Sequence, residues 1–483
     1  MIIIGLDIGT QGARAIACDL DGKVISSKSV GFKALDVSVE ESFREQKAED
    51  WWTAARDTLM FISDDLRKKG ISADEVKTIC VDGTSGTVLA IDREKRPLCN
   101  ALMYNDRRAH KEADEIRVLT RDFEKKVGYA FNSSFALPKI LWIERNRPDI
   151  FEKTHMFVHQ TDYIVGKLCG EYGVSDYSNA LKTGYDLVDE TWPEFISKLG
   201  IERESLPEVR PPGSVIAKIS IEAARETGMS IETKVVAGAT DGYTSALSSG
   251  AAEPGDWATI IGTTMVLKGV TSNLVTDNKG RIYSHKHPQG FWMPGGASNV
   301  GGRCIEVFNK EDFKSMDEAA KDLSPTGVFA YPLTGVGERF PFIDQNAEYS
   351  ISKDNLDEKS LYTALLEGVA YTERLSYDVV ENLGCEVRDE IFTAGGACKS
   401  DVWLQIRADV LGKSLKVPSH TDAAMGAALI GALSQGYSSV KEASNRMIKI
   451  VKTLEPRNEK KKKYDEFYVG FKEMLKNKGY IEN

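Results

Sequence analysis

Apolar residues occur along the chain in short runs that end in glycine and threonine, and the first of these runs opens the sequence. Ile2-Ile3-Ile4-Gly5-Leu6 predicts a buried strand, which passes through Asp7 into a turn at residues 9–12. Glycine lets the backbone of such a turn approach a ligand, and successive N–H groups can form an anion-binding concavity. A carboxylate at the end of an apolar run needs a cation or hydrogen-bond donors beside it, which suits a phosphate and metal site. A tight hairpin in which Asp7 makes an Asx turn explains the same residues.

This pattern occurs a second time. Residues 257–268 again form an apolar run that meets Gly262-Thr263-Thr264 and continues as a second strand. Residues 74–84 and 389–397 also match each other, since each segment has an acidic helix end, a buried strand and a glycine loop. Two halves of similar topology are therefore the simplest organisation. We expect both glycine-threonine hairpins to face one cleft, which would suit the phosphates of a nucleotide.

A third apolar run lies between the two hairpins and ends at a carboxylate. Residues 235–243 read as a buried strand followed by a turn of small residues, with Asp241 at the start of a helix. Thr240 or Asp241 could simply cap that helix. The position of Asp241 favours a functional role, because it falls where the two predicted halves meet.

Length and composition agree with two halves. The chain has 483 residues, of which 42% are apolar and 28% charged, as in an ordinary globular protein with more than one core. We predict an α/β fold with one domain at residues 1–247, a second at 248–483, and a boundary close to 245–252. Apolar residues at helical spacing after Lys460 predict a last helix that packs on the second half.

Charge and targeting signals exclude several classes of partner. The net charge of −10 argues against a nucleic-acid surface, so an anionic nucleotide would have to arrive with a cation. No apolar window reaches the length of a membrane span, and the apolar start lacks a basic leader, so we expect a cytoplasmic protein. Seven scattered cysteines predict buried thiols, and His285 and His287 are expected at the surface rather than on zinc.

Eight short motifs occur in order along the chain: residues 7–14 (DIGTQGAR), 45–52 (EQKAEDWW), 105–108 (NDRR), 238–242 (GATDG), 262–264 (GTT), 337–339 (GER), 367–370 (EGVA) and 394–403 (AGGACKSDVW). Any one of these motifs is weak, whereas eight in sequence at suitable distances are specific. Together they resemble the FGGY family of carbohydrate kinases. The resemblance implies two ribonuclease H-like domains of the actin and hexokinase superfamily, and transfer of a phosphoryl group from ATP with Mg²⁺ to a sugar or polyol.

The resemblance also implies roles for single residues. Asp241 would be the base that takes the proton of the attacking hydroxyl, and Asp7 and Asp241 would bind the metal. The sugar would contact Asp7, Thr10, Ser85, Asp106 and Asp241. The nucleotide would contact the first loop, the second loop and the adenosine segment, namely Gly9, Thr10, Gln11 and Arg14, then Gly262, Thr263 and Thr264, then Gly395, Gly396, Ser400 and Trp403.

The loop at residues 82–88 bears on the substrate. It reads Asp-Gly-Thr-Ser-Gly-Thr-Val, where xylulose kinases have a Met-His element and glycerol kinases an Arg-Glu element. This form resembles the D-ribulose kinase branch, which is xylulose-kinase-like, so the expected substrate is D-ribulose. The hydroxyls of Thr84, Ser85 and Thr87 suit a polyhydroxylated sugar because each donates and accepts, although they could equally cap a turn.

Other functions stay open at this point. Xylulose kinase, or another polyol kinase of the family, is the alternative among enzymes. A nucleotide-dependent structural or chaperone protein is the alternative of another class, because the actin-like superfamily includes both. A sensor that binds sugar without phosphorylating it is a third, and the presence of Asp7 and Asp241 argues against it. The sequence leaves open whether the chain forms a homodimer.

Overall fold

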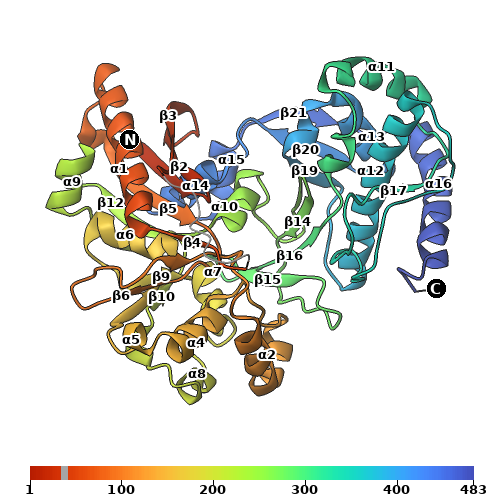
Figure 1. The fold of residues 1–483 in the computed structure, drawn as a ribbon. Coiled ribbons are helices and arrows are strands. Elements are labelled where there is room, and N and C mark those ends of the chain that lie inside the picture. Colours follow the sequence, from red (N-terminus) through yellow and green to blue (C-terminus); the bar gives the residue numbers. More distant parts are fainter. Residues whose placement is uncertain (34–41, 483) are drawn as a thin grey trace. The chain divides into compact units, whose positions relative to one another are not determined.

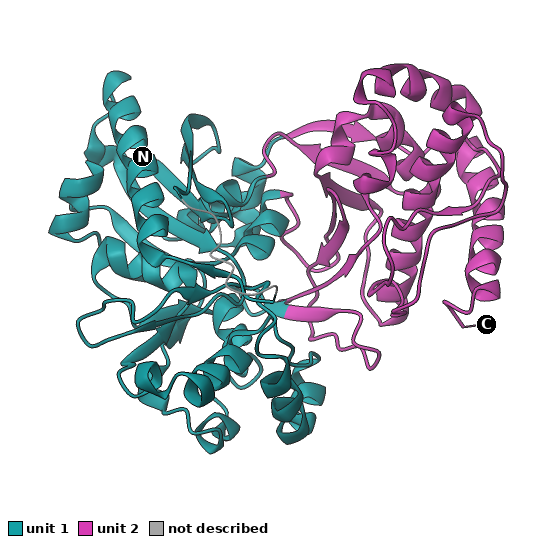
Figure 2. Ribbon diagram, viewed as in Figure 1, with its two compact units in different colours: residues 1–248, 285–290, 422–449 teal, residues 249–284, 291–421, 450–483 magenta. Residues whose placement is uncertain are grey.

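The computed structural model describes residues 1–33 and 42–482, which form two compact α/β units. Unit 1 comprises residues 1–248, 285–290 and 422–449, and unit 2 comprises residues 249–284, 291–421 and 450–483 (Figures 1 and 2). The main boundary at 248 lies inside the predicted range of 245–252. The chain nevertheless crosses between the units more often than a division into 1–247 and 248–483 allows.

A six-stranded sheet forms the centre of unit 1. Its strand order is β11-β12-β5-β1-β2-β3, in which β1 pairs with β5 in parallel and with β2 in antiparallel fashion. The strands of this sheet are β1 (Ile2–Ile8), β2 (Gly12–Asp19), β3 (Val24–Gly31), β5 (Val76–Gly83), β11 (Val215–Lys218) and β12 (Lys234–Thr240). Because β1, β5 and β12 run parallel, their carboxyl ends meet at one edge, where α/β folds commonly bind ligands.

Helices and short strands complete unit 1. The apolar stripe of α1 packs on the sheet, and its buried face includes Trp51, Ala55 and Leu59. The remaining elements are β4 (Glu45–Gln46), α1 (Ala48–Lys68), β6 (Leu89–Ile91), β7 (Ala101–Leu102), α2 (His110–Leu119), α3 (Arg121–Val127), α4 (Ala136–Asn146), α5 (Pro148–Phe151), β8 (Met156–Val158), α6 (Gln160–Cys169), β9 (Val174–Asp176), α7 (Tyr177–Ala180), α8 (Glu194–Lys198), β10 (Glu208–Arg210), α9 (Ile221–Thr227), α10 (Asp241–Ser248), α14 (Ala423–Leu433) and α15 (Val440–Met447).

Helix α14 explains why the predicted second domain loses a segment to unit 1. Ten of its eleven residues are buried, and they are alanine, glycine, methionine, leucine and isoleucine. Small residues let it lie directly on β1 and α10. A Cβ at Gly5 would come within 1.8 Å of the Ala424 carbonyl oxygen, and one at Gly426 within 1.9 Å of the Thr244 carbonyl oxygen. Residues 422–449 therefore complete the core of unit 1, although they follow most of unit 2 in the sequence.

Unit 2 is built around a seven-stranded sheet of order β15-β16-β14-β13-β19-β20-β21. Its strands are β13 (Trp257–Ile261), β14 (Met265–Gly269), β15 (Tyr283–Lys286), β16 (Trp292–Ser298), β19 (Glu390–Ala394), β20 (Ser414–Pro418) and β21 (Ile450–Leu454). The series β16-β14-β13-β19-β20 repeats the order and the strand directions of β3-β2-β1-β5-β12. The predicted internal similarity is therefore confirmed, with β13 matching β1 and β19 matching β5.

Four helices cover the sheet of unit 2. Helix α12 (Glu358–Asn382) packs against α13 (Asp401–Leu411) and α11 (Phe313–Leu323), which also contact each other, and α16 (Asn458–Asn477) packs on α13 (Figure 1). The strands β17 (Ala330–Tyr331) and β18 (Ser350–Ile351) form a separate short pair. The last helix buries Tyr464, Tyr468, Phe471 and Leu475, so its predicted packing on the second half is confirmed.

Two further expectations concern burial. All seven cysteines are free thiols, and four of them are buried, in agreement with the sequence. His285 and His287 were expected at the surface, but both are buried, because residues 285–290 return to unit 1 and His285 lies edge-on to Tyr243. Among the helices of residues 1–33 and 42–482, none is long and apolar enough to cross a membrane.

Candidate active site

The first glycine-threonine turn lines a cavity of unit 1. The cavity has a volume of about 560 Å³ and is formed by the β1–β2 hairpin, the facing end of β3 and Tyr104. It brings together five of the predicted ligand residues, namely Asp7, Gly9, Thr10, Gln11 and Arg14. This volume is within the range of small-molecule sites. Tyr104, which has 38% of its surface exposed, forms the wall opposite the hairpin.

Buried contacts hold the hairpin in place. The Gly9 N–H donates to the Gly12 carbonyl at 2.9 Å, which closes the turn. Gln46 donates its side-chain amide to the Thr10 carbonyl at 2.8 Å and accepts from the Trp51 indole at 2.8 Å. Gly12 is required by strand packing rather than by a ligand, because a Cβ there would come within 2.4 Å of the Val30 carbonyl oxygen. At Gly9 an added Cβ would make only an ordinary contact, 3.7 Å from the Gly12 carbonyl oxygen, so strand packing does not require a glycine there.

Two carboxylates lie side by side at the edge of the sheet. The register of the strands places Asp7 of β1 between Arg14 of β2 and Asp82 of β5. Asp82 is fully buried, and within the described chain neither of its oxygens has a hydrogen-bond partner of good geometry. Burial and the neighbouring Asp7 raise the pKa of Asp82 well above its ordinary value. Burial also raises the pKa of Asp7, against the opposing effect of Arg14.

Asp241 follows directly after the next strand. In the β5–β12 ladder Thr240 pairs with Gly83, so Asp241 emerges at the same edge as Asp7 and Asp82. It is half-buried, and its Oδ1 accepts the N–H of Gly242 at 2.6 Å. Burial, and after it the charge of Asp7, raise the pKa of Asp241 to about 6. A carboxylate with such a pKa is ionised at neutral pH and can still accept a proton, as a general base must.

The acidic edge fits a magnesium ion bound with phosphate. Among residues 1–33 and 42–482 no three aspartate, glutamate, histidine or cysteine side chains are arranged to hold a metal by themselves. Mg²⁺ usually takes only one or two carboxylates together with water and substrate phosphates, so the pair Asp7 and Asp241 is sufficient. The oxygens of Asp82 are buried beside Asp7, and a cation bound nearby would lower the raised pKa of this carboxyl.

The loop at residues 84–87 is held by side chains from two helices. Gln160 accepts hydrogen bonds from the Thr84 N–H at 2.9 Å and from its hydroxyl at 2.8 Å, and the Thr84 and Thr87 hydroxyls lie 2.7 Å apart. His159 Nδ1 lies 3.0 Å from the Thr87 carbonyl oxygen. The two threonine hydroxyls are therefore engaged inside the protein, which favours the interpretation that they cap the turn.

Ser85 differs from the two threonines of this loop. Its hydroxyl oxygen is buried, and no partner reaches it in the part of the chain that the structure describes. Lys139, which is fully buried, donates to the Gly86 carbonyl at 3.0 Å and to the Ser134 carbonyl at 3.1 Å, and so fixes the backbone next to Ser85. An orphaned hydroxyl on a rigid loop is suited to receive a substrate hydroxyl.

Asp106 occupies a different environment from the one expected. Its Oδ2 accepts the Arg44 N–H at 2.7 Å and Arg108 Nη2 at 2.7 Å, and its Oδ1 accepts the Arg108 N–H at 3.0 Å and Nε at 2.9 Å. A carboxylate has about four lone-pair positions, so none is left for a sugar hydroxyl. The prediction that Asp106 binds the substrate is therefore wrong for this arrangement, and Asp106 instead orders the segment that precedes β4.

Unit 2 presents a second hairpin of the same kind. Gly262, Thr263 and Thr264 connect β13 to β14, and the Gly262 N–H donates to the Thr264 carbonyl at 3.0 Å. The Gly302 N–H donates to the Gly262 carbonyl at 2.7 Å, which ties the hairpin to the segment that follows β16. Gly262 and Thr263 are exposed, and no other atom comes within 4 Å of a Cβ at Gly262, so a phosphate can approach the tip.

The segment predicted to contact adenosine, residues 394–403, begins beside this hairpin. Gly395 has a φ of +94°, and a Cβ there would lie 2.3 Å from the Ile261 carbonyl oxygen, so the loop after β19 runs directly along the end of β13. Gly395 and Gly396 are both exposed. Ser400 caps α13 by accepting the Trp403 N–H at 3.0 Å. The structure therefore brings Gly395 and Gly396 to the second hairpin, while Ser400 has a structural role at the start of the helix.

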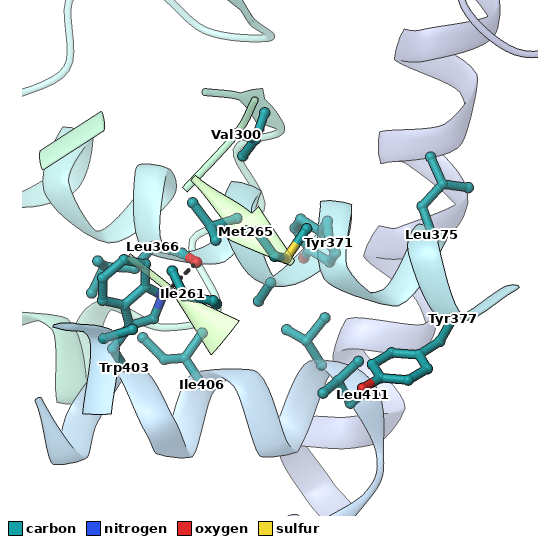
Figure 3. Packing of buried hydrophobic residues seen from close by; sticks show 14 of the residues in the cluster. Ile261, Met265, Val300, Leu366, Tyr371, Leu375, Tyr377, Trp403, Ile406 and Leu411 are labelled. Atoms are coloured by element: carbon teal, nitrogen blue, oxygen red, sulfur yellow. Dashed lines mark hydrogen bonds between the residues drawn. The ribbon is translucent and has the colours of Figure 1, made fainter. Parts of the chain in front are cut away.

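Trp403 does not line this surface. Its side chain is 2% exposed and packs among Ile261, Leu366 and Ile406, with the indole N–H donating to the Leu366 carbonyl at 3.2 Å (Figure 3). The prediction that Trp403 contacts the nucleotide is thus wrong. The residue is the third of its helix after a serine cap, a position that turns its large side chain into the core rather than toward the glycine loop.

Three residues of the site were not predicted. Asp82 occupies the same place on β5 as Asp7 on β1, and the matching pattern of an apolar run, aspartate and glycine in both strands was the signal for it. Asp422, the N-cap of α14, adds a further negative charge that raises the pKa of Asp7. Lys139 carried no usable signal, because a lysine in an apolar helix reads as an exposed position.

The geometry of the two units agrees with comparisons to known proteins. Over 97% of its length, the chain is 25% identical to a xylulose kinase of Bacillus subtilis strain 168, covering 96% of that protein. It is 28% identical to a gluconokinase of the same strain, with 92% of the chain and 90% of the relative covered. A crystal structure of xylulose kinase from Rhodospirillum rubrum superimposes with a TM-score of 0.88 at 25% identity, covering 99% of each chain.

Family domains account for most of the sequence. Residues 2–248 match the N-terminal domain of the FGGY family of carbohydrate kinases, and residues 257–434 match its C-terminal domain. The matched ranges contain both glycine-threonine hairpins, the three carboxylates at the edge of the unit 1 sheet, and the glycine loop after β19. The chain belongs to the FGGY family of carbohydrate kinases and is a sugar kinase.

Proposed function

We propose that this sugar kinase transfers the γ-phosphoryl group of ATP to a hydroxyl of a ketopentose, and that its substrate is D-ribulose, with D-ribulose 5-phosphate as the product. The observation that carries the proposal is the half-buried carboxyl of Asp241, whose pKa of about 6 suits a base, at the same sheet edge as Asp7 and Asp82. Loss of activity of the Asp241→Ala variant would agree with this role.

The reaction requires the protein to position groups rather than to form a covalent bond with the substrate. The Asp241 carboxylate accepts the proton of the sugar hydroxyl while that oxygen attacks the γ-phosphorus, and the bond to the β-phosphate oxygen of ATP breaks, releasing ADP. The turns at residues 9–12 and 262–264 would bind the negatively charged phosphates through backbone N–H groups at their tips, since the N–H groups of Gly9 and Gly262 close the turns themselves. Gly395 and Gly396, which are exposed beside the second hairpin, would contact the adenosine.

A magnesium ion belongs to this proposal. Asp7 and Asp241 would hold it, and the ion would supply positive charge beside the transferred phosphoryl group. Arg14, next to Asp7 in the hairpin, adds a second positive charge on the same side of the cavity.

The choice of D-ribulose rests on residues 82–88. Ser85 offers a buried hydroxyl without a partner in the described chain, whereas the hydroxyls of the adjoining threonines are engaged inside the protein, so Ser85 would be the group that receives a substrate hydroxyl. Relatives of this chain carry the names xylulose kinase and gluconokinase. Xylulose is therefore the alternative substrate, although the Met-His element of xylulose kinases is absent from residues 82–88 of this chain.

A panel of substrates tests the proposal. ADP release coupled to NADH oxidation should be stimulated by D-ribulose, and kcat/KM for D-ribulose should exceed that for D-xylulose, gluconate, glycerol and ribitol. A higher kcat/KM for D-xylulose or gluconate would replace D-ribulose as the substrate. Steady ATP hydrolysis that no sugar stimulates, together with filament assembly or peptide binding, would favour the structural or chaperone alternative.

We also place the protein in the cytoplasm, where ATP and sugar substrates occur together.

A further inference from the structure

The last residue of β12, Thr240, pairs with Gly83 of β5 and is also held by a side chain from outside the sheet. The Thr240 N–H donates to the Ser178 hydroxyl oxygen at 2.8 Å, and the Ser178 hydroxyl donates to Asp176 Oδ1 at 2.6 Å. All three residues are buried, with at most 1% of each surface exposed. The chain of hydrogen bonds therefore has one defined direction, from the backbone of β12 to the carboxylate of Asp176.

The strand needs this support because its pairing is irregular there. Between Val236 and Ala239 the register of β12 on β5 shifts, and the Ala237 N–H donates to the Ser214 carbonyl, away from β5. At Gly238 a Cβ would lie 1.7 Å from the Val81 carbonyl oxygen, so the two backbones touch. A bulge of this kind redirects the strand that follows it, and here the residue that follows is Asp241.

Capping of helix α7 does not account for the Ser178 hydroxyl. Asp176 caps α7 by accepting the N–H groups of Ser178 and Asn179, at 2.8 and 3.0 Å, and its second oxygen accepts the Asn179 side-chain amide at 2.6 Å. These bonds need only the backbone at position 178. The Ser178 hydroxyl is not needed for the cap, and besides Asp176 it contacts the backbone N–H of Thr240, the residue before Asp241.

We propose that Ser178 and Asp176 are positioning residues for Asp241: Asp176 orients the Ser178 hydroxyl, and that hydroxyl fixes the backbone N–H of Thr240, the residue directly before the catalytic carboxylate. The inference rests on the proposed role of Asp241 as the base. Neither residue touches the reacting groups, so both act on the orientation of Asp241 and leave sugar and ATP contacts unchanged. Displacement of a catalytic group by about 1 Å can cost on the order of 100-fold in rate.

Steady-state kinetics of the Ser178→Ala variant test the proposal. With the sugar that gives the highest kcat/KM in the wild type, kcat is expected to fall at least tenfold, while KM for the sugar and for ATP changes less than twofold. Ser178→Thr keeps a hydroxyl at the same position and should recover most of the lost kcat. Asp176→Asn, which weakens the acceptor, should lower kcat by an intermediate factor.

Ser175→Ala is the matched control. Ser175 is also buried and lies one residue before Asp176, but its hydroxyl makes no hydrogen bond to Asp176, Ser178 or Thr240, so its removal leaves the path to Thr240 intact. Its kcat should stay within twofold of the wild type. Melting temperatures of all variants show whether each one is folded at the assay temperature.

The outcomes separate this inference from the proposed function. If Ser178→Ala is folded and keeps wild-type kcat, or if Ser178→Ala and Ser175→Ala lose kcat equally, the positioning role is overturned. If Ser178→Ala is unfolded, the comparison of Ser178→Thr with Asp176→Asn decides. The positioning role is overturned if these two variants lose kcat equally, because only Ser178→Thr keeps both the hydroxyl and the carboxylate that orients it. A wild-type protein that phosphorylates no sugar would instead defeat the proposed function.

Discussion

Asp241 gives the first prediction, which concerns pH. Burial and Asp7 raise the pKa of Asp241 to about 6, and the base works only as the carboxylate. As the pH falls below 6 the carboxyl is protonated, so kcat/KM for the sugar should drop about tenfold per pH unit, and it should be level above pH 7. Initial rates between pH 4.5 and 8.5 measure this limb. A rate that stays constant down to pH 5 contradicts the assigned base.

Replacing Asp241 provides the second prediction. Asp241→Ala should lower kcat by a factor on the order of 100 to 10,000, the usual contribution of a general base. Binding of ATP without Mg²⁺, measured by calorimetry, should stay nearly the same, because the predicted phosphate contacts are backbone groups elsewhere and Asp241 would reach the nucleotide only through the metal. A variant with wild-type turnover removes Asp241 as the base.

Lys139 gives a third prediction, on stability. Burial lowers the pKa of Lys139 to about 7, whereas an unfolded lysine titrates near 10.4. Between these values the unfolded chain binds a proton that the folded protein does not, so Lys139 makes stability rise with pH, by at most about 1.4 kcal/mol per pH unit. The difference in unfolding free energy between the wild type and Lys139→Met should grow in favour of the wild type from pH 7 to pH 9.

Urea unfolding followed by circular dichroism measures that difference. Lys111→Met, at an exposed position of α2, is the control and should follow the wild type at every pH. Parallel curves for the wild type and Lys139→Met would mean that Lys139 is protonated in the folded protein throughout this range.

Single residues also show where sequence patterns stop being informative. Asp7 and Asp241 were recognisable because each ends an apolar run. A carboxylate in such a place costs free energy unless a cation or hydrogen-bond donors lie beside it. Asp106 and Trp403 lie in equally good motifs, but the Asp106 carboxylate is hydrogen-bonded to Arg108 and the Trp403 side chain is buried in the core of unit 2. A motif identifies a segment, whereas the direction of each side chain depends on contacts with distant residues.

Helices and strands were more predictable than side chains. The similarity between the segments that became β1, β2 and β5 and those that became β13, β14 and β19 is local in sequence, so the shared topology followed from patterns alone. The register that puts Asp82 beside Asp7 depends on pairing between strands about 70 residues apart, which no local pattern specifies.

The packing of α14 on α10 gives a fourth prediction. In an isolated helix Gly426→Ala would stabilise by about 1 kcal/mol. Here the new Cβ would lie 1.9 Å from the Thr244 carbonyl oxygen, and backbone cannot yield as a side chain does. Overpacking of this kind typically costs 1–3 kcal/mol, so the melting temperature should fall by a few degrees.

Gly335→Ala is the control for that change. Gly335 has no heavy atom within 4 Å of an added Cβ and needs no left-handed backbone, so its melting temperature should stay close to that of the wild type. A Gly426→Ala protein that melts at or above the wild-type temperature would show that α14 can move away from α10.

The composition of the two units could not be read from the sequence. The fold class and the boundary near residue 248 followed from length, apolar runs and repetition. That residues 422–449 complete unit 1 depends on the fit of Gly5 against Ala424, a contact between residues more than 400 positions apart. Whether the two glycine-threonine hairpins share one cleft, as the sequence suggested, stays a prediction.

Division of binding between the units provides the last prediction, which hydrogen exchange can measure. D-ribulose alone should slow exchange in unit 1, at residues 7–14 and 84–87, because these segments contain the predicted sugar contacts. ADP with Mg²⁺ should slow exchange in unit 2, at residues 261–265 and 394–400. At ten times Kd, a ligand lowers the free energy of the bound state by about 1.4 kcal/mol, so amides that exchange only from the ligand-free protein should slow about tenfold.

Helix α16 contains no predicted contact and serves as the internal reference. Slowing by ADP at α16 or at residues 84–87, with residues 261–265 unchanged, would contradict the assignment of the nucleotide to the second hairpin, because backbone N–H groups that bind phosphate cannot exchange while it is bound.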